Sequence, residues 1–303
     1  MATENPQHQF NLFGRPDTAT SVLPSPAALI EKHGRDLALV INMSGGKDST
    51  RLLGYIREQF PAVKTYVVMA DTGFEHVKPI SAEDWARRVT ASFGLDLITV
   101  KNPNKTYLEM VERRGKFPSM GQRTCTSDLK RSPIDVILRG VAERVIINCT
   151  GIRAEESPNR GKMNPWTLNE AVSIKERRTK AGRVFQQART VYNWMPIFEE
   201  TLADVLNWHH ATGTPLHPVY IPEYHVDGTK GGYLRRLSCR VCIFNTDADI
   251  RAIYVHDREA FDLVATLEQR INFTMKSKKS LFQIIGQDIS LDNNVEFGRP
   301  CAA

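Results

Sequence analysis

Short hydrophobic runs, separated by polar segments, recur through the first half of the 303-residue chain. Runs of this kind, with almost no polar residues inside them, predict strands that are buried on both faces of a sheet. The segments between them repeat hydrophobic residues at helical spacing, as Leu52, Leu53 and Ile56 do. Strands that alternate with helices predict an α/β fold with a doubly wound, mostly parallel sheet, for which we expect five strands. Four of these strands are expected at residues 37–43, 66–70, 95–100 and 145–149.

The pattern changes in the second half of the chain. Residues 158–190 are polar and basic without a clear period, which is typical of a mobile lid. Beyond them, hydrophobic spacing predicts helices near 201–212, 246–254 and 258–271. We therefore expect three parts, namely a flexible leader, an α/β domain and a smaller C-terminal helical region that carries cysteines. Their predicted bounds are 1–27, 28–235 and 236–303.

The composition is that of an ordinary globular protein, with 41% hydrophobic and 24% charged residues. No segment approaches the roughly 20 apolar residues that a membrane helix needs. The first residues lack the basic start and the apolar run of a signal peptide, so we expect a cytoplasmic protein with no membrane partner. The net charge of +6 suits an anionic substrate such as a nucleotide, a sulfonucleotide or a nucleic acid, without choosing among them.

Three polar segments that contain the candidate chemistry directly follow predicted strands. They cover residues 44–50, 71–76 and 150–160. The carboxyl ends of parallel strands lie at one edge of a sheet, and ligands of such folds bind at that edge. We therefore expect the three segments to converge on one site.

The first of these segments, Ser44-Gly45-Gly46-Lys47-Asp48-Ser49-Thr50, joins a predicted strand to a predicted helix. Its two glycines let backbone N–H groups approach an anion, and the helix offers its positive N-terminus to the same charge. The three hydroxyl groups and the Lys47 ammonium add further donors. Because the spacing is not that of a Walker loop, we interpret the segment as a different phosphate-binding loop. The alternative is an ordinary turn between a strand and a helix.

The same seven residues resemble the PP-loop of the adenine nucleotide α-hydrolase superfamily, which has a HUP-like fold. Within that superfamily, the chain resembles the phosphoadenosine phosphosulfate (PAPS) reductase family. Four further regions carry the resemblance, which extends over about residues 37–245. They are Asp71-Thr72-Gly73-Phe74-Glu75, Thr150–Ser157, Trp194–Ile197 with Ala203–Val205, and Leu216–Tyr220.

The resemblance implies a nucleotide ligand, either ATP or a sulfonucleotide, and a set of residues that holds it. Asp48 would bind either the phosphates or Mg²⁺ beside them, and Asp71 would bind Mg²⁺ or the ribose. The residues expected to bind the nucleotide are Ser44, Gly45, Gly46, Lys47, Asp48, Ser49, Thr50, Asp71, Thr72, Gly73, Gly151 and Arg153.

The resemblance also implies that Lys47, Asp48, Arg153 and Glu156 are catalytic, with Arg153 and Glu156 close to the nucleotide or the sulfur centre. A planar guanidinium suits a phosphate or a sulfate group. The alternative for Arg153 is a surface salt bridge with Glu156 or the neighbouring Glu155. Trp208, His209, His210, His217 and Tyr220 are further candidates for the lining of the nucleotide pocket, although single residues of these types more often pack or face solvent.

Three of the five cysteines, Cys125, Cys239 and Cys242, stand at positions that match the family's iron–sulfur members. Those members have a Cys-Cys pair in the first region, where this chain has Thr124 before Cys125. Three thiolates can hold a [4Fe–4S] cluster with one open iron. The alternatives are zinc, with His217 or His225 as a fourth ligand, and plain thiols without a metal.

For the remaining two cysteines, the sequence gives weaker indications of a chemical role. Cys149 lies inside a predicted strand and is expected to be a core residue. The reductases that the chain resembles use a nucleophilic cysteine in a C-terminal Glu-Cys-Gly-Leu-His motif. Cys301 lies near the C-terminus without the rest of that motif, which disfavours it as a nucleophile.

The run Arg123–Lys130 resembles the ATP pyrophosphatase of DNA phosphorothioation systems. We therefore favour an enzyme that cleaves the α–β phosphate linkage of ATP to adenylate an acceptor for sulfur insertion. DNA is the favoured acceptor, and a cysteine desulfurase or another sulfur donor protein is the expected partner. The first alternative is a reductase of phosphoadenosine or adenosine phosphosulfate. The second is a catalytically silent subunit that binds nucleotide or nucleic acid, which the basic runs at 175–178 and 276–279 would suit.

Overall fold

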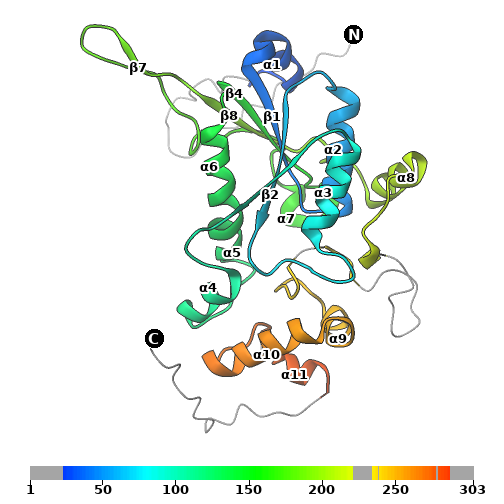
Figure 1. Ribbon diagram of the computed structural model, residues 1–303. Helices are drawn as coiled ribbons and strands as arrows, with labels where there is room; N and C mark the ends of the chain where they lie inside the picture. Colours follow the sequence, from blue (N-terminus) through cyan, green and yellow to red (C-terminus); the bar gives the residue numbers. More distant parts are fainter. Residues whose placement is uncertain (1–22, 221–233, 238, 278, 287–303) are drawn as a thin grey trace, which may run out of the picture.

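A computed structural model describes residues 23–220, 234–237, 239–277 and 279–286, and these form an α/β structure around one central sheet (Figure 1). The sheet has the strand order β3-β2-β1-β4-β8-β5, in which the first five strands are parallel and β5 is antiparallel to β8. The strands are β1 (Leu37–Asn42), β2 (Thr65–Asp71), β3 (Leu97–Lys101), β4 (Val145–Thr150), β5 (Trp166–Leu168) and β8 (Thr190–Trp194).

The doubly wound, mostly parallel sheet confirms the predicted fold class, with one correction to the number of strands. The five parallel strands are joined by a sixth, β5, so the sheet is six-stranded rather than five-stranded. Strand β5 has only three residues and follows a polar region, so it carries no hydrophobic run that the sequence pattern can detect.

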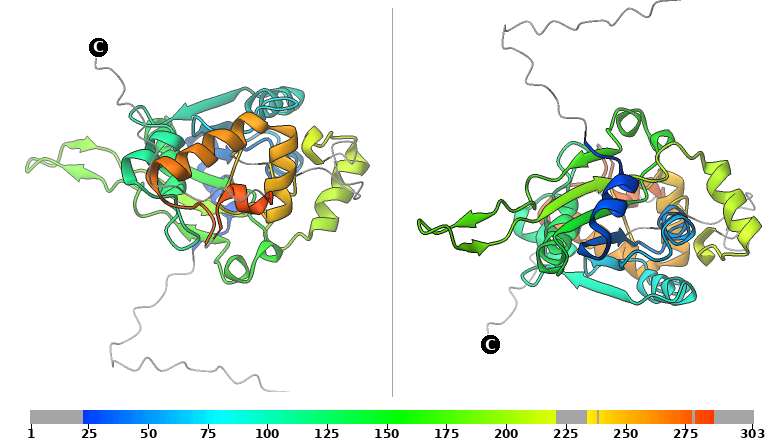
Figure 2. Two further views of the ribbon diagram at one scale, coloured as in Figure 1. Left: turned by 90° about the horizontal axis from the view of Figure 1, so that it is seen from below. Right: turned by 90° about the horizontal axis from the view of Figure 1, so that it is seen from above.

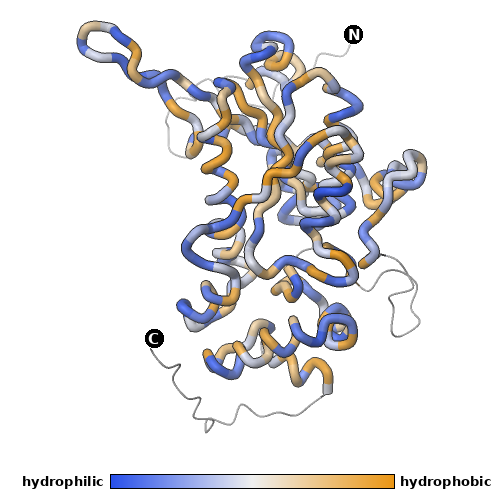
Figure 3. Tube along the Cα trace, viewed as in Figure 1, coloured by the Kyte–Doolittle hydropathy of each residue, from blue (hydrophilic) through white to orange (hydrophobic). Residues whose placement is uncertain are grey.

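Helices cover both faces of the sheet because β1 is hydrophobic on both sides. Leu39 and Ile41 belong to the larger core, which includes residues from α2 (Lys47–Gln59) and α3 (Ala82–Ser92). Ala38 and Val40 belong to a smaller core with Leu138 of α6 (Ser132–Gly140). Figure 3 shows the strands of the sheet as the hydrophobic centre of the molecule. The helices of this α/β unit are α1 (Pro26–His33), η1 (Gly34–Asp36), α2 (Lys47–Gln59), α3 (Ala82–Ser92), α4 (Tyr107–Arg114), α5 (Thr124–Thr126), η2 (Ser127–Arg131), α6 (Ser132–Gly140), η3 (Ala154–Glu156), α7 (Pro158–Gly161), α8 (Leu202–Thr212) and η4 (Pro218–Tyr220).

The region expected to be a lid contains three separate structures. Residues 158–161 form α7, residues 166–168 join the sheet as β5, and β6 (Arg177–Arg178) pairs with β7 (Val184–Gln186) in a hairpin. The hairpin projects from the body of the protein in every view (Figures 1 and 2). It leads directly into the first residue of β8, so it lies at the amino end of the parallel strands. The hairpin is therefore not a lid over the carboxyl edge, and that part of the prediction is wrong.

The C-terminal helices α9 (Asp247–His256), α10 (Arg258–Ile271) and α11 (Leu281–Ile284) form a layer below the carboxyl edge of the sheet (Figure 1). Cys239 pairs with Glu75 in an isolated β-bridge, which ties the segment before α9 to the loop after β2. The guanidinium of Arg240 makes two hydrogen bonds to the Asp257 carboxylate, at 2.6 and 2.8 Å. The division into domains at residue 236 stays a prediction.

Across the described ranges, no helix combines the length and the apolar character that crossing a membrane requires.

Candidate functional site

The phosphate-binding loop lies between the end of β1 and the start of α2. Gly45 has a φ of +74°, and a Cβ atom on it would lie 2.8 Å from the Ala82 carbonyl oxygen, so only glycine fits. The Ser49 hydroxyl oxygen accepts a hydrogen bond from the Ser44 backbone N–H at 3.2 Å and lies 3.1 Å from the Ser44 hydroxyl. These contacts fix the loop in a closed turn at the carboxyl edge, as expected from the sequence.

The N-terminus of α2 lies at this turn. Its N-cap is Gly46, which has no side chain to cap the helix. The first N–H groups of a helix have no acceptor within the helix, so those of α2 face the turn as donors, and that of Lys47 contacts the Tyr220 hydroxyl. The Lys47 ammonium lies 3.3 Å from the Asp48 carboxylate and 5.1 Å from the centre of the Tyr220 ring. His209 contacts the Lys47 carbonyl oxygen at 3.1 Å, and this contact supports the first turn of α2.

Arg153 joins the loop after β4 to the first turn of α2. Its Nε donates to Asp48 at 2.7 Å, and its Nη1 donates to Glu155 at 2.7 Å. Arg153 is only 4% exposed. A surface salt bridge, the alternative interpretation, would explain its contact with Glu155 but neither its burial nor its contact with Asp48. Gly151 permits this approach, since a Cβ atom on it would lie 2.8 Å from the Asp48 carbonyl oxygen.

Two arginines without a role predicted from the sequence lie beside Glu156, close to Arg153. Arg160 pairs with Glu156, and Arg236 lies 3.5 Å from the same carboxylate. Burial, followed by the positive charges of Arg236 and Arg123, lowers the pKa of Arg160 to about 10. In the sequence, the four-residue spacing of Glu156 and Arg160 is the pattern that could have indicated this ion pair.

An exposed aromatic ring completes this arginine cluster, by which we mean Arg123, Arg153, Arg160 and Arg236. Phe244 is 40% exposed, and the guanidinium groups of Arg123 and Arg236 each lie 5.9 Å from the centre of its ring. The four guanidinium groups outnumber their carboxylate partners Asp48, Glu155 and Glu156, which leaves an excess of positive charge. Such a concentration of guanidinium groups is suited to a polyphosphate or another multiply charged anion.

The loop after β2 also reaches the carboxyl edge, but several of its polar groups bond to one another or to neighbouring segments. The Gly73 N–H donates to the Asp71 carboxylate at 2.7 Å, and the Thr72 hydroxyl donates to Glu75 at 2.9 Å. Lys130 pairs with Glu75 at 3.4 Å, and this carboxylate is the main cause of the raised pKa of Lys130. The predicted roles of Asp71, Thr72 and Gly73 in binding the nucleotide stay predictions.

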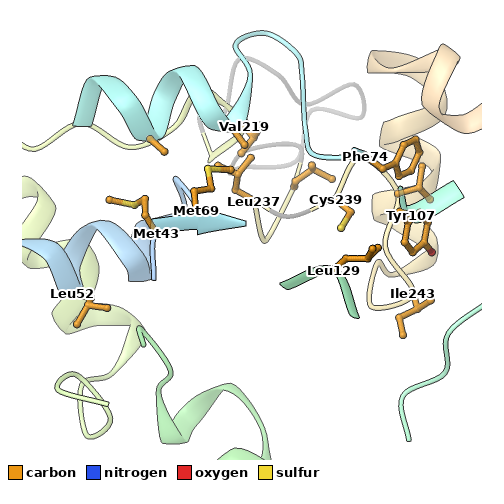
Figure 4. Packing of buried hydrophobic residues seen from close by; sticks show 14 of the residues in the cluster. Met43, Leu52, Met69, Phe74, Tyr107, Leu129, Val219, Leu237, Cys239 and Ile243 are labelled. Atoms are coloured by element: carbon orange, nitrogen blue, oxygen red, sulfur yellow. The ribbon is translucent and has the colours of Figure 1, made fainter. Parts of the chain in front are cut away.

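The three selected cysteines come together below this loop. Burial, and after it the nearby Cys239, Cys242 and Cys125 thiols, raises the pKa of Tyr107 well above its usual value. Cys239 lies between Leu237 and the stacked rings of Phe74 and Tyr107 (Figure 4). Burial is the main cause of the raised pKa of both Cys125 and Cys239, and Cys242 adds to each shift. Segments more than 100 residues apart in the sequence therefore place their thiols in one neighbourhood.

The spacing and the type of these side chains determine which metal or iron–sulfur cluster they could hold. Thiol donors from two segments suit a soft metal or an iron–sulfur cluster. In the described residues, however, no three His, Cys, Asp or Glu side chains stand close enough to hold a metal ion. A cluster would therefore require the thiols to draw together.

The zinc alternative with His217 does not fit. The His217 ring contacts the Ile80 carbonyl oxygen at 3.1 Å through Nε2 and accepts from the Val219 N–H at 3.1 Å through Nδ1, so both of its nitrogens are used. His225 and Cys301 lie outside the described residues. Cys149 is fully buried, in agreement with the expected core position.

The other aromatic candidates differ in their contacts with the loop. Tyr220 lies beside Gly46 and accepts a hydrogen bond from the Leu237 N–H at 2.9 Å. The Trp208 ring packs against Gly54 on the outer side of α2, and its indole N–H donates to Glu58. Of the aromatic residues considered, Tyr220 thus contacts the phosphate-binding loop directly, whereas Trp208 braces α2.

Comparison with known proteins shows what the chain is similar to. A protein of Escherichia phage 186, described as an uncharacterized 37.8 kDa protein in the gpa 5′ region, is 23% identical over 287 residues, which covers 80% of this chain and 78% of the phage protein. The phosphate complex of phosphoadenylyl-sulfate (PAPS) reductase from Candida auris has a TM-score of 0.38 and 15% identity, covering 59% of this chain and 74% of that chain.

A second solved structure is similar at the same level. The U34-tRNA thiolase NcsA from Methanococcus maripaludis, solved with its [4Fe-4S] cluster, has a TM-score of 0.38 and 15% identity, covering 85% of this chain and 74% of that chain. The model of the phosphoadenosine phosphosulfate reductase domain matches residues 38–234, which include the phosphate-binding loop and Arg153. Because this match covers more than half of the chain, the protein belongs to the phosphoadenosine phosphosulfate reductase domain family.

Proposed function

We propose that this protein is an ATP pyrophosphatase that adenylates an acceptor for sulfur insertion. The observation that carries the proposal is the N-terminus of α2, which has no side-chain cap and where Lys47 and the buried Arg153 both contact Asp48. Backbone N–H groups, an ammonium and guanidinium groups are the donors that stabilise negative charge on a reacting phosphate.

The proposed reaction has two steps. An acceptor oxygen attacks the α-phosphorus of ATP, the bond between this phosphorus and the bridging oxygen to the β-phosphate breaks, and pyrophosphate leaves. A sulfur nucleophile then displaces AMP from the adenylated acceptor. Lys47 and the N-terminus of α2 would hold the phosphates, while the arginine cluster would take up the charge that develops on the departing pyrophosphate.

Mg²⁺ is the expected companion of the nucleotide, and it would supply further neutralisation of phosphate charge. Mg²⁺ sites of this kind need only one or two carboxylates in addition to the phosphates. Asp48 meets this need, because its carboxylate lies beside Lys47 at the loop. Binding the ion would require Asp48 to exchange its contacts with Lys47 or Arg153.

DNA is the acceptor that we propose, with a cysteine desulfurase or another sulfur donor protein as the partner. The resemblance of Arg123–Lys130 to the ATP pyrophosphatase of DNA phosphorothioation systems supports this choice. We also propose a [4Fe–4S] cluster on Cys125, Cys239 and Cys242, supported by the convergence of the three thiols beside Tyr107.

The test is the release of pyrophosphate from ATP with Mg²⁺ present, compared between the wild type, Lys47→Ala and Lys32→Ala. Lys32 is an exposed lysine of α1 and serves as the matched control. We expect turnover in the wild type and the control and its loss in Lys47→Ala. ATP binding without any release of pyrophosphate, with every acceptor tested, would leave a silent nucleotide-binding subunit as the remaining interpretation.

A second candidate, a sulfonucleotide reductase, is favoured by the family to which the chain belongs. This reaction needs a nucleophilic cysteine, and Cys301 is the candidate near the C-terminus. Sulfite release from a sulfonucleotide in the presence of a thiol reductant, lost in Cys301→Ser, would select this candidate over the ATP pyrophosphatase.

A further inference from the structure

A basic hairpin extends from the end of the sheet opposite the phosphate-binding loop (Figure 1). From Lys175 to Arg183, five basic residues accompany one acidic residue, a net charge of +4 in nine residues, where the whole chain has +6. All nine residues are exposed. Much of the net charge of the chain therefore lies on a segment that projects from the body of the described structure.

Most of these cations have no counter-ion in the described structure, whereas several basic residues of the nearby body are paired. Arg178 pairs with Glu176 at 2.7 Å, whereas Lys175, Arg177, Lys180 and Arg183 have no acidic partner among the residues that the structure describes. By contrast, Lys64 pairs with Glu143 and Arg144 pairs with Asp36 at the same end of the sheet. Unpaired cations held this close together repel one another, and a polyanion would relieve the repulsion.

The hairpin also presents an aromatic ring at an irregular position. Arg177 pairs with Gln186 and Arg178 with Val184, so Phe185 is the extra residue of a β-bulge. Its ring is 63% exposed. A bulge redirects a side chain, and an exposed ring amid cations is suited to contact the sugar or a base of a nucleic acid.

The base of the hairpin is firmly attached even though its tip is free. Ile174 and Arg189 exchange two backbone hydrogen bonds of 2.8 Å, and the Arg189 guanidinium donates to carbonyl oxygens at the end of α6, at 2.7 Å in the case of Val141. A two-stranded hairpin that packs on nothing is only marginally stable in water. The hairpin is therefore a positively charged β-ribbon that is anchored at its base and that a binding partner would stabilise.

We propose that the hairpin at residues 174–189 is a DNA-binding arm that engages the phosphate backbone of duplex DNA. The major groove of B-form DNA admits a two-stranded β-ribbon, whereas the narrow major groove of duplex RNA does not. The arm deepens the proposed function and rests on it for the choice of DNA as acceptor. It lies away from the phosphate-binding loop, so its DNA contacts do not require ATP turnover.

The test is the fluorescence anisotropy of a labelled duplex DNA, titrated with the full chain without ATP at salt concentrations from about 50 to about 200 mM. The arm variant combines Lys175→Gln, Arg177→Gln, Lys180→Gln and Arg183→Gln. The control variant removes the same charge from exposed cations that lack an acidic partner in the described structure, namely Lys32→Gln, Arg35→Gln, Arg88→Gln and Lys101→Gln.

We expect the arm variant to bind at least about tenfold more weakly than the control, with a salt dependence reduced by about three to four released counterions. Thermal unfolding should be unchanged, since the substituted side chains are exposed. Equal weakening in both variants, no DNA binding by the wild type, or a preference for RNA would each overturn the proposal. The DNA titration is independent of Lys47, so a DNA-binding protein that releases no pyrophosphate would overturn the proposed function while leaving the arm intact.

Discussion

The Nε of Arg153 lies 2.7 Å from the Oδ1 of Asp48, although the two residues are 105 positions apart in the sequence. One residue follows β4 and the other opens α2, so the contact joins two of the three segments expected at the carboxyl edge. The same carboxylate also lies near the Lys47 ammonium. Asp48 therefore holds two cations in position for an anion that would bind between them.

Replacing Arg153 with Lys tests this arrangement. The compact ammonium of Lys cannot reproduce the two directed bonds to Asp48 and Glu155. We expect kcat/KM for pyrophosphate release to fall about 10- to 100-fold, which corresponds to one charge-assisted hydrogen bond. Arg87→Lys alters an exposed pair with Glu83 and is the matched control, with an unchanged rate expected. Equal rates for both variants would remove Arg153 from the reaction.

The conformation of the phosphate-binding loop predicts a contrast between two glycines. Gly45 and Gly115 both have positive φ angles, but only at Gly45 would a Cβ atom meet the backbone, at the Ala82 carbonyl oxygen. We expect Gly45→Ala to cost about 2–3 kcal/mol of stability and to abolish ATP binding, whereas Gly115→Ala should cost about 1 kcal/mol and leave binding unchanged. Urea unfolding and calorimetric titration with ATP measure the two effects. ATP binding by Gly45→Ala with wild-type affinity would contradict the assigned role of the loop.

Glu268 predicts a pH-dependent stability of the C-terminal helices. It is 1% exposed, and burial raises its pKa to about 7 even though the N–H groups of Met275 and Leu281 donate to it. The folded protein therefore binds more protons than the unfolded chain between about pH 4.5 and 7, so the free energy of unfolding falls as the pH rises through this window. The loss contributed by this residue is about 3 kcal/mol at most.

Two buried histidines have the opposite effect, so the measurement must isolate Glu268. Burial lowers the pKa of His76 and of His217 to about 4, and stability from these groups is therefore gained as the pH rises from about 4 to about 6.5. The difference between the wild type and Glu268→Gln in urea unfolding, measured from about pH 5 to about pH 8, cancels the contribution of the histidines. A difference that does not change with pH would show that Glu268 titrates normally.

The three thiols around Tyr107 predict a spectroscopic difference among cysteine variants. If they hold a [4Fe–4S] cluster, anaerobically purified protein should absorb near roughly 400 nm and contain iron and sulfide. We expect Cys125→Ser, Cys239→Ser and Cys242→Ser each to reduce the band strongly, while Cys149→Ala, which changes a fully buried core cysteine, should retain it. A colourless, iron-free and active wild-type protein would exclude the cluster.

The sequence determined many of the elements of this protein and the position of its phosphate-binding loop, because both depend on local patterns. Hydrophobic runs defined four of the five parallel strands, and the Gly45-Gly46 pair before a helical repeat marked the loop. Only the tertiary structure brought Arg160 and Arg236 to Glu156, gathered three cysteines beside Tyr107, and placed the basic hairpin at the opposite end of the sheet. These relationships arise from the crossing of strands and the packing of distant segments, for which hydrophobic periodicity carries no signal.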